Sequence, residues 1–120
     1  MGYPALRVAT TTSVRVAMFG RIAFVGLIGN RPLIQLGHQQ IRNAFAKVGL
    51  REAHNAHFIK RLIQRGPHYG IRTLNDFARA MNNGVARAGA QKGTTEIVFP
   101  NGRAAAVVNA AGELVTLLPL

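Results

Sequence analysis

The chain has 120 residues, which is enough for one domain with a core that needs neither disulfides nor metals. It contains no cysteine, so thiol catalysis, zinc–thiolate sites and iron–sulfur clusters are excluded. Fifteen Lys and Arg against four Asp and Glu give a net charge of +11, which indicates a polyanionic partner such as nucleic acid, an anionic membrane or an acidic protein. Most of the cations are Arg, whose planar donor fork matches phosphate, although a solvated basic surface is the alternative.

Residues 1–30 differ in composition from the rest of the chain. We interpret them as a lead-in or linker segment that packs on the domain, which spans residues 31–120. Residues 8–14 are rich in β-branched side chains, and residues 14–28 form the most apolar stretch. Arginines interrupt this stretch, and it is shorter than the roughly 20 apolar residues of a spanning helix. We therefore expect no stable membrane insertion, while brief membrane contact during entry into a cell stays open.

Helical spacing of apolar residues begins at Pro32 and predicts successive helices. The first predicted helix runs from Pro32 and stops at Gly49, because glycine favours the end of a helix. The second is expected over about residues 52–64, and Gly66 with the proline after it ends that helix.

The third predicted helix begins at Thr73, which caps it together with Asp76 three residues later. Its predicted core face consists of Leu74, Phe77, Ala78 and Met81. The pattern then changes to short apolar runs separated by glycine turns, which predicts strands at residues 96–99, 103–109 and 113–118. Helices followed by an antiparallel meander define an α+β fold.

The second predicted helix presents a polar stripe, because residues three and four apart share a helix face. His57, Lys60 and Arg61 lie on this stripe, followed by Gln64 or Arg65. A histidine beside fixed cations suits RNA cleavage, since imidazole can remove the proton of the ribose 2′-hydroxyl while the cations stabilise the phosphorane. This reaction requires no metal or cofactor, because the nucleophile belongs to the substrate. The alternative is a solvated basic helix face with incidental histidines.

A predicted loop at residues 66–70 contains His68 and Tyr69, with Arg65 before it and Arg72 after it. An aromatic ring and an imidazole among cations can stack on an unpaired base, which makes these four residues candidate RNA contacts. An ordinary connecting loop is the alternative interpretation.

Three residues of the predicted sheet region complete the candidate site. Thr116 is a polar residue in an apolar row, where its partner would be a phosphate oxygen or a backbone carbonyl. Arg103 opens the second predicted strand, where it reaches the same surface or faces water. Thr95 ends a glycine-containing run and is a candidate contact to backbone phosphates.

A metal site is not expected. His54 and His57 have a spacing that allows zinc binding, but further ligands would have to come from His38, His68 or an acidic residue. The two cations that follow His57 on the predicted helix would repel a dication. The four acidic residues are scattered over different predicted elements, which argues against a two-metal nuclease.

Several short stretches together form a pattern: AHFIKR at residues 56–61, RG at 65–66, IRTLNDF at 71–77, NGRA at 101–104 and GELVTLLP at 112–119. With this pattern, the part of the chain from about residue 54 to residue 120 resembles the toxin superfamily that groups barnase, EndoU, colicin D-type and RelE-type ribonucleases. It looks most similar to C-terminal toxin domains of contact-dependent growth-inhibition and related polymorphic toxin systems.

The resemblance implies a fold of helices packed on a small curved sheet, and an activity of RNA cleavage with transfer RNA as the expected substrate. It implies that His57 is the general base or acid, that Arg61 and Lys60 bind the phosphate and stabilise the transition state, and that Thr116 is a phosphate ligand on a strand. It further implies a monomer that is delivered at the cell surface or secreted as part of a larger toxin and acts in the target-cell cytoplasm. A cognate acidic immunity protein would complement the positive charge.

Two other classes of function stay open. A non-catalytic nucleic-acid binder would keep the basic surface but would lose nothing on substitution of His57 alone. A membrane-active toxin would use residues 14–28, and vesicle leakage would reveal it.

Overall fold

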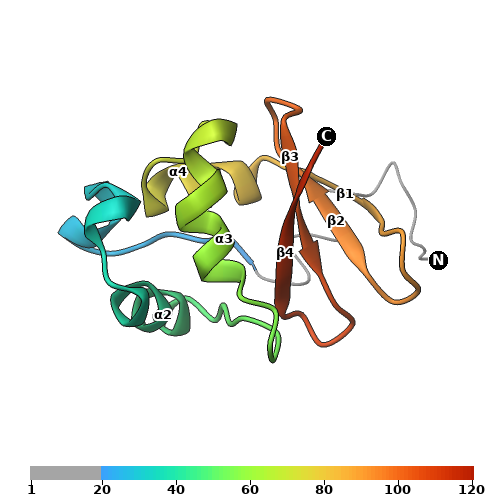
Figure 1. The fold of residues 1–120 in the computed structure, drawn as a ribbon, viewed down its shortest axis with the longest axis horizontal. Helices are drawn as coiled ribbons and strands as arrows, with labels where there is room; N and C mark the ends of the chain where they lie inside the picture. Colours follow the sequence, from blue (N-terminus) through green and yellow to red (C-terminus); the bar gives the residue numbers. More distant parts are fainter. Residues whose placement is uncertain (1–19) are drawn as a thin grey trace.

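The computed structural model describes residues 20–120, which form three α-helices followed by a four-stranded antiparallel sheet (Figure 1). The helices are α2 (His38–Lys47), α3 (Phe58–Arg65) and α4 (Leu74–Asn82). The 3₁₀ helices are η2 (Leu27–Asn30), η3 (Leu33–Gln35) and η4 (Gly66–Tyr69). The strands are β1 (Val85–Ala88), β2 (Thr95–Val98), β3 (Ala104–Val108) and β4 (Leu114–Pro119). This arrangement confirms the predicted α+β class.

The sheet is a meander with the order β1-β2-β3-β4, in which each strand pairs antiparallel with its neighbour in the sequence. Strands β2, β3 and β4 match the predicted strands to within one residue at each end. Strand β1 was not predicted. Only Ala86 of this strand is buried, so the alternation of apolar and polar side chains that indicates a strand is missing there.

The helices cover one face of the sheet and meet in a cluster of phenylalanine rings. Each helix contributes one ring: Phe45 from α2, Phe58 from α3 and Phe77 from α4. The ring centroid of Phe77 lies 5.6 Å from that of Phe45 and 5.7 Å from that of Phe58, which are ordinary aromatic packing distances. The sheet supplies a cross-strand row of buried apolar residues: Ile97, Ala106 and Leu117.

The first predicted helix begins later than the expected Pro32, because α2 starts at His38. Two features of the intervening segment interrupt the helix. The backbone N–H of Leu33 donates to the carbonyl of Arg72 at 2.8 Å, which ties this part of the chain to the segment before α4. Gly37 is extended, with φ −71° and ψ 152°, so regular helix geometry resumes only after it.

The prediction that the second helix begins near Glu52 is wrong, because α3 starts at Phe58. The backbone on both sides of Glu52 pairs with Leu114 at the start of β4. The carbonyl of Arg51 accepts the N–H of Leu114 at 2.9 Å, and the N–H of Ala53 donates to the carbonyl of Leu114 at 2.8 Å. Asn55 and His57 then have positive φ values of 62° and 56°, which a right-handed helix does not allow. A contact distant in the sequence therefore overrides local helical spacing.

The third predicted helix is confirmed. Thr73 caps α4 by accepting the N–H of Asp76 at 3.0 Å, and the Asp76 carboxylate accepts the N–H of Thr73 at 3.1 Å. The predicted core face is buried throughout: Leu74, Phe77, Ala78 and Met81.

Part of the lead-in segment lies in the described region and contacts the helices. Ile22 is buried, and its backbone exchanges two hydrogen bonds with the side-chain amide of Asn82, at 2.7 and 2.8 Å. Phe24 stacks on Phe45 with 6.0 Å between ring centroids. The β-branched residues 8–14 lie outside the described residues. Within residues 20–120, no helix has the length and apolar character needed to cross a membrane.

Candidate nucleic-acid interface

His57 stands in a turn with a backbone conformation that residues other than glycine rarely adopt. It directly precedes α3 and has φ 56° and ψ 36°, the left-handed region. A left-handed conformation costs a residue with a β-carbon roughly 1–2 kcal/mol. The side chain of His57 is exposed and has no hydrogen-bond partner among the described residues. Strain of this kind gathers at functional sites, which makes this exposed imidazole the first candidate.

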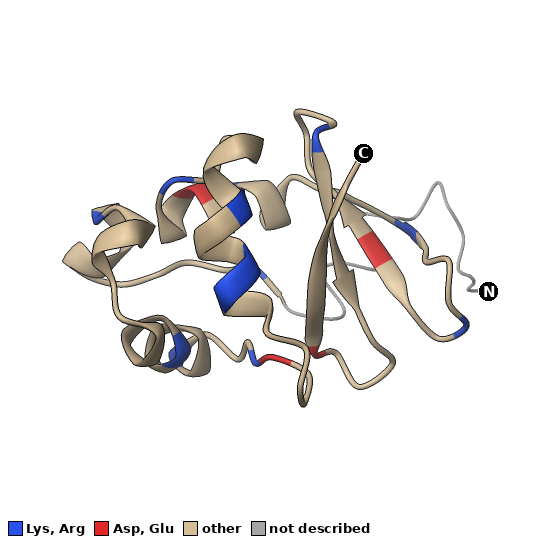
Figure 2. Cartoon of the chain, in the orientation of Figure 1, with Lys and Arg blue, Asp and Glu red and all other residues tan. Residues whose placement is uncertain are grey.

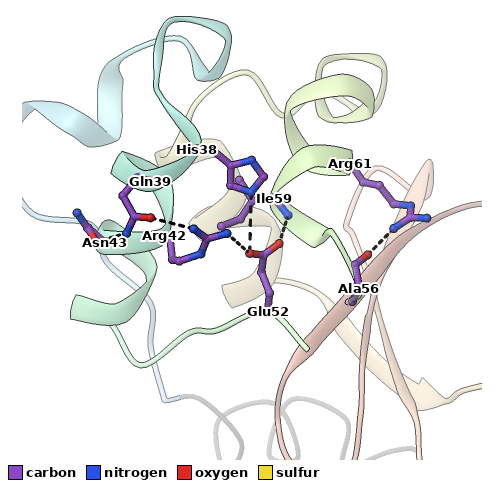
Figure 3. Close-up of polar contacts among 8 residues, drawn as sticks. All are labelled: His38, Gln39, Arg42, Asn43, Glu52, Ala56, Ile59 and Arg61. Atoms are coloured by element: carbon purple, nitrogen blue, oxygen red, sulfur yellow. Dashed lines mark hydrogen bonds and ion pairs between the residues drawn. The ribbon is translucent and has the colours of Figure 1, made fainter. Parts of the chain in front are cut away.

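The carboxylate of Glu52 takes the capping role that His57 does not fill. Its Oε2 accepts the N–H of Ile59 in the first turn of α3 at 2.9 Å (Figure 3). Its Oε1 lies 3.2 Å from Nη2 of Arg42 and 3.9 Å from Nε2 of His38, so the same carboxylate ties α2 to α3. Glu52 accepts one of the free N–H groups of this helix terminus, and the imidazole of His57 makes no capping bond and stays available for a ligand.

Arg61 folds back onto the turn that precedes its own helix. Its Nη1 donates to the carbonyl oxygen of Ala56, the atom on the peptide that leads into His57 (Figure 3). This hydrogen bond holds a guanidinium one peptide away from His57. Lys60, three residues after His57, is exposed on the same helix. The structure thus brings these three predicted site residues to one end of α3.

The ion pairs leave the cations of α3 uncompensated. Every acidic residue of the chain lies in the described part, and each pairs with an arginine outside α3: Glu52 with Arg42, Glu113 with Arg51, Asp76 with Arg79 and Glu96 with Arg87. Lys60, Arg61 and Arg65 have no carboxylate partner among residues 20–120. In Figure 2, α3 accordingly shows basic positions and no acidic one. This helix surface favours a polyanion.

A second group of predicted residues gathers at the opposite end of α3. Arg65 ends the helix, and the expected loop after it is the 3₁₀ helix η4, with His68 exposed and Tyr69 half-buried. Asn101 in the β2–β3 turn donates to the carbonyl of Tyr69 at 2.7 Å and accepts the N–H of Arg103 at 3.0 Å. These bonds place the β2–β3 turn, with the exposed Arg103, against η4.

Two predicted residues, Thr116 and Thr95, lie apart from both groups, and a third, Arg72, follows the second group in the chain. Leu117 is buried in the core, so strand alternation places its neighbour Thr116 on the opposite sheet face from the helices. Thr95 begins β2, which β3 separates from β4. Arg72 lies between η4 and α4, where its N–H donates to Asp76 at 2.9 Å.

Within residues 20–120, no group of three or more His, Asp or Glu side chains is placed to hold a metal ion. His54 and His57 both precede α3, so they do not share a helix face. A cavity of about 490 Å³ between residues 23–28 and α2 contains none of the predicted site residues.

Two residues that organise the site were not predicted from sequence as such: Glu52, which caps α3, and Asn101, which joins the β2–β3 turn to η4. Asn101 and Tyr69 are 32 positions apart, and no local pattern signals a contact at that separation.

No protein-family model matches the chain, and no match was found among curated proteins or among solved structures.

Proposed function

We propose that this chain is a metal-independent endoribonuclease that binds RNA along α3 and cleaves it with the imidazole of His57. The observation that supports the proposal is the exposed imidazole in a strained turn, with the Arg61 guanidinium fixed at the preceding peptide. An exposed histidine with a free side chain and a neighbouring fixed cation suits proton transfer at a phosphodiester.

In the proposed reaction, the imidazole of His57 removes the proton from a ribose 2′-hydroxyl. The 2′-oxygen attacks the adjacent phosphorus, and the P–O bond to the 5′-oxygen of the next nucleotide breaks, which yields a 2′,3′-cyclic phosphate. The leaving 5′-oxygen takes a proton from water, and the imidazolium of His57 returns its proton to solvent. Arg61 and Lys60 donate hydrogen bonds to the non-bridging oxygens, where charge grows in the transition state. Thr116 is left out of this mechanism, because it belongs to the other face of the sheet.

The proposal includes the biological setting that the resemblance implies. The chain would be the toxic domain of a larger delivered protein, with transfer RNA as substrate in the target-cell cytoplasm. A cognate acidic immunity protein would be its protein partner. The uncompensated cations of α3 support a polyanionic or acidic partner for this surface, since opposite charge speeds association and selects partners.

The proposal is tested by incubating the purified chain with total RNA in excess EDTA. We expect discrete transfer-RNA fragments whose 5′ ends, read by sequencing, define the cleaved bond. His57→Ala is expected to slow cleavage by at least about 100-fold, the usual contribution of acid–base catalysis, while RNA affinity changes little. His54→Ala is the matched control, because His54 is also exposed but lies three residues further from the start of α3 than His57, and it should keep full activity.

Two results would contradict the proposal. Undiminished cleavage by His57→Ala would move the chemistry to another residue. Intact RNA with tight, salt-sensitive binding would identify a non-catalytic nucleic-acid binder instead.

A further inference from the structure

We infer that a cavity beside Tyr69 binds one unpaired nucleobase of the RNA. The inference rests on the proposed function and adds a base-recognition site to it. The cavity has a volume of about 210 Å³ and lies where the end of η4, the C-terminal half of α4 and the β2–β3 turn meet. It is therefore adjacent to the group of residues that includes Arg65, His68 and Arg103.

The walls of the cavity suit the flat face of a base. Ile71 and Phe99 are buried residues that line it, and Pro100 and the half-buried ring of Tyr69 complete the apolar part. Stacking of bases on aromatic and apolar side chains is how proteins hold unpaired nucleotides. Tyr69 is packed against the core, so its ring is ordered before a ligand arrives.

Polar atoms at the cavity are available for the edge of a base. The hydroxyl of Tyr69 and the Oδ1 of Asn83 have no hydrogen-bond partner among residues 20–120. The hydroxyl both donates and accepts, and the amide oxygen accepts. Asn101, in contrast, uses its Nδ2 and its Oδ1 within the protein, which makes it a fixed part of the wall.

The charges around the cavity favour a phosphate backbone at its rim. Asp76 is the acidic residue of the wall, and its carboxylate accepts two backbone N–H groups and the guanidinium of Arg79. Its negative charge is thereby compensated. Arg72, Arg103 and His68 are exposed on the adjoining segments and make no ion pair with a carboxylate of the described region.

The size of the cavity selects a single base. Sites for drug-sized ligands measure about 300–1,000 Å³, so this smaller cavity admits one ring system while the sugar and phosphate stay outside. Helix α3 has eight residues, and at 1.5 Å per residue it separates His57 from η4 by about 12 Å. The cavity lies beyond this end of α3, so the bound base belongs to a nucleotide other than the one whose 2′-hydroxyl reacts, and the site would set sequence preference.

The test fills the cavity without removing any contact. Ala80 lies half-buried on α4 in the wall, and Ala80→Leu would add a branched side chain there at no cost in helix propensity. Ala46→Leu is the matched control, on the exposed side of α2. Affinities would be measured by fluorescence anisotropy for 2′-O-methyl uridine octamers that carry a single adenine, guanine or cytosine. These probes lack the attacking hydroxyl and stay intact.

We expect the unaltered chain and Ala46→Leu to prefer one of these bases by about fivefold or more, and Ala80→Leu to lose that preference. If Ala80→Leu fails to fold, Tyr69→Leu, which removes the ring, should give the same loss. Two results overturn the base pocket and leave the proposed function intact. One is salt-sensitive RNA binding by the unaltered chain without base preference. The other is a base preference that both Ala80→Leu and Tyr69→Leu retain. A chain that neither binds nor cuts RNA overturns both.

Discussion

At the scale of single residues, the turn before α3 places two side-chain-bearing residues where glycine is favoured. Asn55 and His57 are the residues other than glycine with positive φ in the described part of the chain. Asparagine tolerates this conformation because its short polar side chain can bond locally, whereas histidine gains no such bond here. The left-handed conformation of His57 thus lowers the stability of the fold, and under the proposed function a catalytic role of the imidazole accounts for its presence.

This strain predicts that the variant His57→Gly is no less stable than the unaltered chain. Relief of the left-handed conformation, offset by the greater entropy of glycine in the unfolded state, should raise the free energy of unfolding by about 0.5 kcal/mol. Urea denaturation measures this change, and the RNA cleavage assay should show loss of activity. Asn55→Gly is the control that relieves similar strain and keeps cleavage. A loss of stability in His57→Gly would show that the imidazole packs against the fold.

At the scale of elements, Glu52 connects three of them. Its backbone neighbours pair with β4 at Leu114, while its carboxylate caps α3 at Ile59 and binds Arg42 of α2. The side chain of Glu52 is 13% exposed, so solvent replaces these bonds poorly when they are lost. This carboxylate therefore helps to fix the N-terminal end of α3, beside His57, on α2 and β4.

Removal of the carboxylate is expected to destabilise the fold by about 2 kcal/mol, because Glu52→Ala leaves a helix N–H without its acceptor. Arg42→Ala removes the more exposed partner and should cost less than about 1 kcal/mol. The free energy of unfolding from urea denaturation compares the two variants. Equal effects would mean that the ion pair, and not the cap, holds α3 in place.

The elements differ in how far sequence predicts them. The start of α4 is encoded locally by Thr73 and Asp76, so the prediction succeeded. The start of α3 depends on the pairing of the segment before it with Leu114, more than fifty residues away. The local spacing of apolar residues does not indicate this pairing. The candidate site divides in the same way. Helical spacing predicted His57, Lys60 and Arg61 on one helix face, whereas only Lys60 and Arg61 belong to α3 and His57 lies in the left-handed turn before it. The face on which Thr116 lies follows from which side of the sheet the helices cover.

At the scale of the whole molecule, the charge of +11 is unevenly compensated. The carboxylates pair with Arg42, Arg51, Arg79 and Arg87, while the cations of α3, those at the rim of the Tyr69 cavity and several others in the described region have no carboxylate partner. Binding of RNA to such a surface releases counterions, and affinity then falls steeply as salt rises.

Substitution of two cations on α3 should lower this salt dependence. Each phosphate contact to a single strand contributes about 0.7 to the slope of log affinity against log salt, so Lys60→Gln with Arg65→Gln should reduce the slope by roughly 1.4. Arg51→Gln is the control, because it also removes one positive charge per substitution. Arg51 pairs with Glu113 at 3.3 Å and should contribute little to the salt slope. An unchanged slope in the double variant would place the RNA on another face.

The pairing of the chain with itself at Leu114 limits how other molecules can join the sheet. A bare sheet edge offers free N–H and C=O groups, and a foreign strand can add to it, as happens in β-augmentation and in aggregation. At Leu114 both backbone groups are already bonded within the molecule. A partner that approaches β4 at this point must therefore bind through side chains, because it cannot add a strand by main-chain hydrogen bonds to Leu114.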